Sequence, residues 1–115
     1  MEHKNLAEGG WAELTLAEQM ANIGSEVERA ITWKEKGNLE YSDKAFFRSL
    51  ELLGMSLDAQ KSGSRLKELA RLYEALVDYF LFDNEFSSSD ELWRKYFYPH
   101  TYHASLLRNA KFIQD

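Results

Sequence analysis

Apolar residues recur at steps of three and four along most of this chain, a spacing typical of amphipathic α-helices. In residues 16–36 the predicted stripe consists of Leu16, Met20, Ile23, Val27, Ala30 or Ile31, and the stem of Lys34. Thr15 and Glu18 match the S/T-x-x-E capping box, in which two side chains satisfy free backbone N–H groups at a helix start. Gly24 lies inside this helix and would let a neighbouring helix approach closely.

A second helix is predicted after a break at Gly37-Asn38, starting between Leu39 and Ser42 and ending at Leu53 or Leu57. We expect the buried face to consist of Ala45, Phe46, Ser49, Leu50, Leu53 and Leu57. Gly54 is expected to end or kink this helix. The short link predicts that the first two helices are antiparallel neighbours.

A third helix is predicted over residues 64–82, and apolar residues cover more than half of its circumference. Its main face consists of Leu66, Leu69, Ala70, Tyr73, Leu76, Val77 and Phe80. A helix with such a wide apolar face is either central in a fold or shared with a second chain. The surrounding stretch, residues 65–103, holds ten of the chain's sixteen aromatic residues, which favours the same two explanations.

The last helix is predicted to begin at a second capping box, formed by Ser88 and Glu91. Pro99 removes a backbone donor, so we expect the helix to kink or restart there. The predicted fold is all-α, a four-helix antiparallel up-down bundle. Residues 1–10 are expected to form a flexible N-terminus and residues 11–115 a single domain.

Composition excludes several kinds of function. The chain has no cysteine, which rules out disulfides and zinc-thiolate sites. Its net charge of -5 argues against sequence-blind binding along duplex DNA. The first residues lack the apolar run of a signal peptide, and no window resembles a membrane span, so we expect a cytoplasmic protein with no membrane contact. No motif predicts a cofactor.

The charge is unevenly distributed, because residues 92–114 carry four basic residues and no acidic one. Two interpretations are open. This basic segment could face RNA or an acidic partner. Alternatively, it neutralises the acidic body of its own chain, where eleven of the nineteen acidic residues lie within residues 1–58.

His100 and His103 are three positions apart and could share one helix face. Two histidines could bind a metal, but no third ligand is evident in the sequence, and no Glu-x-x-His pair is present. We therefore predict no metal site and interpret both as surface histidines beside aromatic rings.

Arg94 and His100 are the candidate catalytic residues. Arginine can stabilise charge on a phosphate and histidine can move a proton near neutral pH, so together they could support metal-free RNA cleavage. The segment Arg94-Lys95-Tyr96-Phe97-Tyr98-Pro99-His100, in a helical bundle of this size, resembles the HEPN superfamily. That family's motif is an arginine followed after four to six residues by a histidine.

This resemblance implies an RNA-cleaving or RNA-binding protein of the toxin–antitoxin type, in which dimerisation brings two motifs to one cleft. Two residues depart from the family pattern. Lys95 replaces the usual small polar residue, and Pro99 lies inside the motif. Residues 33–52 also resemble the turn and second helix of a tetratricopeptide repeat, but no second copy occurs, so we interpret them as a helical hairpin.

Two functions are consistent with the sequence. The first is a non-catalytic interaction module that forms a homodimer and binds an unknown protein partner. Its expected interface residues are Tyr73, Tyr79, Phe82, Trp93, Tyr96, Tyr98, Tyr102 and His103. The second is an HEPN-like ribonuclease, or an RNA-binding relative, that uses Arg94 and His100. The first predicts that these two residues are separated or salt-bridged, whereas the second predicts that they converge in a basic cleft.

Overall fold

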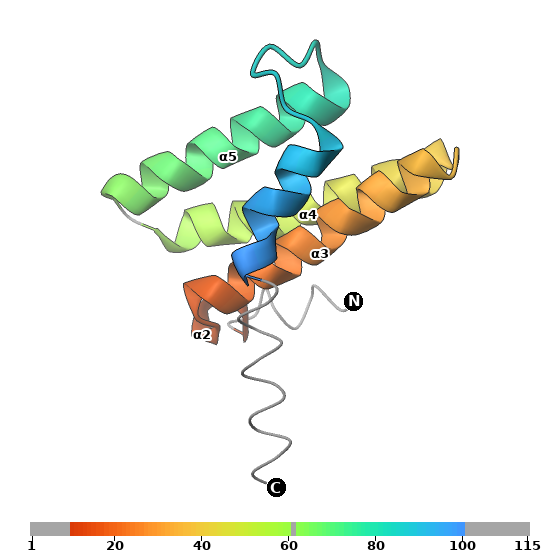
Figure 1. Cartoon of the computed structure of the whole chain (residues 1–115). Coiled ribbons are helices and arrows are strands. Elements are labelled where there is room, and N and C mark those ends of the chain that lie inside the picture. The colour runs from red at the N-terminus through yellow and green to blue at the C-terminus, as the bar shows by residue number, and fades with distance from the viewer. Residues whose placement is uncertain (1–9, 61, 101–115) are drawn as a thin grey trace, which may run out of the picture.

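A computed structural model describes residues 10–60 and 62–100 of the chain. Short α2 (Trp11–Glu13) is followed by α3 (Leu16–Glu35), α4 (Leu39–Ala59) and α5 (Ser64–Leu81) (Figure 1). Residues 90–100 form a further helix, which we call the last helix. The described residues contain no strand, which confirms the all-α class.

The start of α3 has the predicted capping box. The Thr15 hydroxyl accepts a hydrogen bond from the backbone N–H of Glu18 (3.1 Å), and the Thr15 N–H donates to the Glu18 carboxylate (3.0 Å). Thr15 is extended while the residues after it are helical, so the cap fixes where α3 begins. The predicted stripe is buried apart from half-buried Leu16 and Lys34, and its fully buried members are Met20, Ile23, Val27, Ala30 and Ile31.

Helices α3 and α4 form the predicted antiparallel hairpin. Gly37 has a φ of 81° at the turn, and the Asn38 side chain caps α4 by accepting from the Tyr41 N–H (3.0 Å). The helix continues through Gly54 to Ala59, so the predicted end at Leu53 or Leu57 is wrong by two residues or more. Gly54 costs roughly 1 kcal/mol of helix propensity, which the packing of α4 outweighs.

The core lies between α3, α4 and the two later helices. Phe46 of α4 is fully buried and stacks on Phe80 of α5, with ring centroids 4.6 Å apart. Of the broad apolar face predicted for α5, Leu69 and Leu76 are buried, whereas Tyr73 and Val77 are half-buried. The helix therefore lies at the margin of the core and leaves part of its apolar face accessible.

The last helix begins one residue later than the predicted capping box requires. The Asn84 side chain exchanges two hydrogen bonds with the backbone of Ser88 (2.8 and 2.9 Å), which places Ser88 in the turn before the helix. The cap is Ser89, whose hydroxyl accepts a hydrogen bond from the Leu92 N–H (3.1 Å). The prediction of Ser88 as the cap is therefore wrong. The helix continues through Pro99 to residue 100, and a restart beyond it would fall outside the described residues.

Contacts along the last helix show that it runs antiparallel to α3. Its first residue, Asp90, binds Lys34 near the end of α3, and Phe97 lies against Gly24 in the middle of α3. In Figure 1 the last helix passes over α3 at an angle, and α5 is set apart from α3. These pairwise contacts do not establish a closed four-helix bundle. None of the helices in the described ranges is long and apolar enough to cross a membrane.

Candidate functional site

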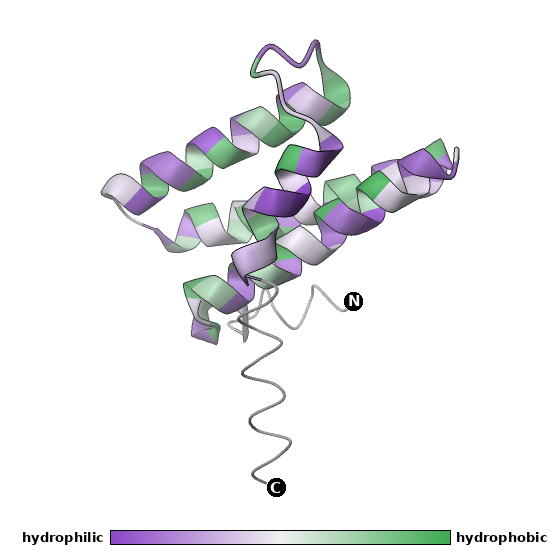
Figure 2. Cartoon of the chain, viewed as in Figure 1, coloured by the Kyte–Doolittle hydropathy of each residue, from purple (hydrophilic) through white to green (hydrophobic). Residues whose placement is uncertain are grey.

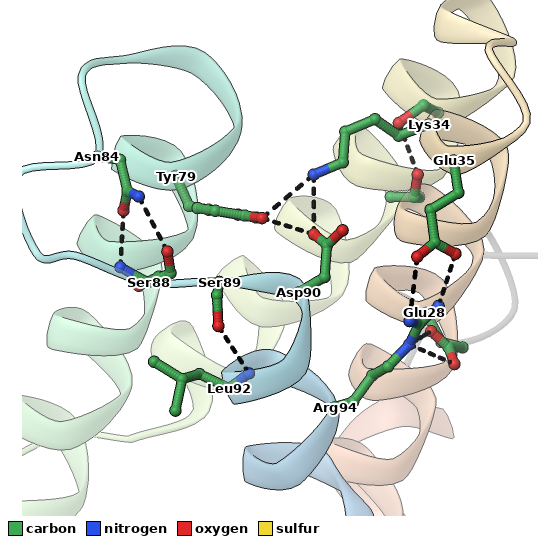
Figure 3. A network of polar contacts seen from close by, with 12 residues as sticks. Glu28, Lys34, Glu35, Tyr79, Asn84, Ser88, Ser89, Asp90, Leu92 and Arg94 are labelled. Atoms are coloured by element: carbon green, nitrogen blue, oxygen red, sulfur yellow. Dashed lines mark hydrogen bonds and ion pairs between the residues drawn. The ribbon is translucent and has the colours of Figure 1, made fainter.

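Arg94 projects from the last helix onto two acidic residues of α3. Its Nε atom donates to both carboxylate oxygens of Glu28 (2.8 and 3.0 Å), and its two terminal nitrogens donate to Glu35 (3.1 and 3.3 Å) (Figure 3). Glu28 and Glu35 are seven positions apart, so they lie on the same face two turns apart on α3. The hydrogen bond to Glu35 and, to a smaller extent, the hydrogen bond to Glu28 raise the pKa of Arg94 above its ordinary value. The guanidinium of Arg94 therefore stays positively charged between the two carboxylates.

His100 is half-buried at the end of the described helix, with its ring centroid 6.4 Å from that of Tyr96. The helix is continuous from Arg94 to His100. In a regular helix two residues six positions apart lie about 120° apart around the axis and about 9 Å apart along it. Ideal helix geometry therefore places the two side chains in different directions around the helix axis.

A second polar cluster joins three helices. Lys34 of α3 donates to Asp90 (2.8 Å) and to the Tyr79 hydroxyl of α5 (3.2 Å), and that hydroxyl donates to Asp90 (2.5 Å) (Figure 3). The Lys34 ammonium also lies over the Tyr79 ring, 4.6 Å from its centroid. This partly buried triad links α3 and α5 to the first residue of the last helix.

The triad shifts the pKa of each member. Burial alone would raise the pKa of Asp90, but hydrogen bonds from Lys34 and Tyr79 outweigh it and lower that pKa. Burial alone would lower the pKa of Lys34, but hydrogen bonds with Asp90 and Tyr79 raise it. Burial and the hydrogen bond to Asp90 raise the pKa of Tyr79. All three shifts favour the ionisation states that hold the triad together.

A groove of about 620 Å³ lies between α3 and the last helix. Its lining includes Trp33, Lys36, Trp93, Phe97 and Tyr98, together with the Arg94–Glu28 pair. Trp93 is buried, and its indole N–H has no hydrogen-bond partner in the structure described. Within residues 10–60 and 62–100, no group of three or more histidine, aspartate or glutamate side chains is placed to bind a metal ion.

The predicted interface residues differ widely in exposure. Phe82 is 72% exposed, Tyr98 63% and Tyr96 38%, whereas Tyr73 and Tyr79 are half-buried. Trp93 belongs to the chain's own core, where it stacks with Phe97. Tyr102 and His103 lie outside the described residues, as does the predicted flexible N-terminus except Gly10.

Sequence reasoning missed both polar clusters. Glu28 and Glu35 stand on the polar side of α3, and nothing local marks them as partners of a residue 59 or more positions away. The placement of Lys34 on an otherwise apolar stripe was the one available signal, because a buried ammonium needs a partner. That signal gives no indication that Tyr79 and Asp90 are the partners.

No protein-family model matches this chain, and neither a curated protein nor a solved structure matches it. The resemblances to the HEPN superfamily and to the tetratricopeptide repeat therefore stay predictions.

Proposed function

We propose that this chain is a non-catalytic interaction module that self-associates through the end of α5 and the last helix. One observation carries the proposal. Of the nine large apolar side chains that are exposed in the described residues, six lie within residues 81–98: Leu81, Phe82, Phe86, Leu92, Tyr96 and Tyr98. Figure 2 shows hydrophobic colour at the end of α5 and on the first turn of the last helix.

Exposed side chains of this size favour association. Burying a leucine or phenylalanine side chain contributes about 1.5–3 kcal/mol, so several of them on one segment provide a driving force for binding. Monomeric proteins rarely expose contiguous apolar patches larger than a few hundred Å², so larger patches mark interaction surfaces. The proposed module is a homodimer, and each copy is a four-helix antiparallel bundle located in the cytoplasm. A further protein partner would bind this module.

The surroundings of Arg94 support a structural role for it over a catalytic one. Its guanidinium is held by two carboxylates, and Asp90 adds a third negative charge nearby. A phosphate group would have to displace these carboxylates against their own negative charge. The part of the basic segment that the structure describes thus neutralises acidic residues of its own chain.

The test compares two leucines of similar exposure. Leu92 and Leu39 are 54% and 63% exposed, and each lies in the first turn of a helix, where an added carboxylate is tolerated. We expect Leu92→Asp to be monomeric by light scattering, at concentrations where wild type and Leu39→Asp are dimeric. A monomeric wild type, or equal masses for all three proteins, contradicts the proposal.

An RNA-cleavage assay belongs beside the mass measurement. Wild type and His100→Ala are incubated with a mixed RNA pool after circular dichroism has shown that both are folded. We expect no cleavage by either protein. Cleavage by wild type that disappears in His100→Ala would replace the proposed module with the HEPN-like ribonuclease.

A further inference from the structure

The outer face of the last helix carries two apolar and two charged residues in a regular order. Leu92 and Tyr96 are four positions apart and form one exposed ridge, 54% and 38% exposed. Glu91 and Lys95 run beside this ridge, four positions apart, and their side chains are 79% and 73% exposed. They form only a long intrahelical ion pair of 3.6 Å.

Leu92, Glu91 and Lys95 take no part in the polar contacts that hold the last helix on α3. Tyr96, in contrast, packs edge-on against Trp93 and Phe97 and lies near Glu68 of α5. In Figure 3 Leu92 and Arg94 project in different directions from the helix, and Arg94 is engaged by Glu28 and Glu35. Asp90 is engaged by Lys34 and Tyr79. Binding on the outer face therefore leaves both polar clusters intact.

Glu91 and Lys95 can pair with the same two residues of a second copy when the two helices are antiparallel. When a two-fold axis relates two antiparallel helices, the same edge of each helix meets with its sequence order reversed. We infer that two copies of this chain pair their last helices antiparallel, with Leu92 of one against Tyr96 of the other and Glu91 of one beside Lys95 of the other. This inference rests on the proposed self-association and adds its geometry.

Parallel pairing does not use these charges. A two-fold axis that runs parallel to two helices brings opposite edges of the helices together, so Glu91 and Lys95 of one copy would not face Lys95 and Glu91 of the other. Antiparallel pairing instead supplies two intermolecular opposite-charge pairs around a small apolar centre. An apolar centre with a charged rim is the usual composition of a protein interface.

The experiment exchanges the two charges one at a time and together. In the antiparallel pair, Lys95→Glu brings four carboxylates together and Glu91→Lys brings four ammonium groups together. We expect each single variant to raise the dimer dissociation constant by about tenfold or more. The double variant Glu91→Lys/Lys95→Glu restores both opposite-charge pairs, so we expect a dissociation constant within about threefold of wild type. A mixture of the two single variants should form heterodimers.

The chain contains a matched control in α4. Glu40 and Lys44 have the same spacing at the same positions of their helix, with an ion pair of 3.4 Å and exposed side chains. The corresponding changes there should leave the dissociation constant unchanged, and circular dichroism monitors the fold of every variant. Single variants at 91 and 95 that dimerise like wild type, while Leu92→Asp is monomeric, overturn the antiparallel pairing and leave the self-association standing. A monomeric wild type overturns both.

Discussion

Gly24 is the residue whose size sets the distance between α3 and the last helix. A Cβ atom at this position would lie 2.8–2.9 Å from the Cβ, Cγ and Cδ1 atoms of Phe97, closer than such atoms pack. Phe97 is buried and stacks with Trp93, so it has little freedom to move away. The sequence alone indicated that Gly24 leaves room for a neighbouring helix, but the close approach and its partner Phe97 could be identified only from the fold.

We expect Gly24→Ala to lower the free energy of unfolding by up to about 2 kcal/mol. Alanine gains about 1 kcal/mol of helix propensity, and forcing a methyl group into a packed core costs about 1–3 kcal/mol. Urea denaturation measures the difference.

Gly54 provides the control for this substitution. It also lies inside a long helix, but a Cβ atom there would meet nothing within 4 Å apart from the nearby backbone of its own helix. Gly54→Ala should therefore raise the free energy of unfolding by about 0.5–1 kcal/mol. If both alanine variants are stabilised equally, the close approach of Phe97 to Gly24 is not a constraint on the fold.

At the scale of helices, the triad of Lys34, Tyr79 and Asp90 makes stability depend on pH. The raised pKa values of Lys34 and Tyr79 mean that the folded chain retains protons that the unfolded chain releases. The contribution of Lys34 and Tyr79 to the free energy of unfolding is complete below about pH 10 and is lost as the pH rises through their pKa values in the folded chain. The lowered pKa of Asp90 acts in the other direction, and its contribution is lost as the pH falls below about 4.

We expect the free energy of unfolding to fall between about pH 10 and 11, and to fall less steeply in Asp90→Asn. The substitution removes the carboxylate that binds both protonated groups, so their pKa values move back toward ordinary values. Urea titrations at pH 8, 10 and 11 measure the difference in slope. Glu40→Gln removes an exposed acid from the first turn of α4 and should keep the wild-type slope. Equal slopes in wild type and Asp90→Asn would show that the triad does not couple to folding.

The helices themselves could be predicted from the sequence because their signals are local. Thr15, Glu18 and the apolar stripe of α3 fix one helix through contacts within a few positions. The end of α4 beyond Gly54 and the choice of Ser89 over Ser88 could not be predicted in this way. Tertiary packing decides the first, and a hydrogen-bonded turn around Asn84 decides the second.

The candidate site was less predictable because it depends on contacts between distant segments. Arg94 was singled out by its spacing from His100, yet its observed partners are Glu28 and Glu35. A charged residue on one helix has no local signature of the charges that will face it after folding. The same limit applies to the pairing of Lys34 with Asp90, 56 positions apart.

At the scale of the whole molecule, dimerisation and folding stability should be coupled. A partner that binds only the folded chain stabilises it, by about 2.7 kcal/mol when its free concentration is 100 times the dissociation constant. In a chain of 115 residues, 1 kcal/mol shifts the melting temperature by roughly 4 °C. The melting temperature of wild type should therefore rise by several degrees over a hundredfold increase in protein concentration.

The same measurement on the two leucine variants separates this coupling from a nonspecific effect of concentration. Leu92→Asp should melt at one temperature across the range, because it removes the apolar ridge by which two copies meet. Leu39→Asp should follow wild type, because it lies at the turn between α3 and α4 and outside residues 81–98. Identical concentration dependence in Leu92→Asp and wild type would mean that the last helix does not carry the association.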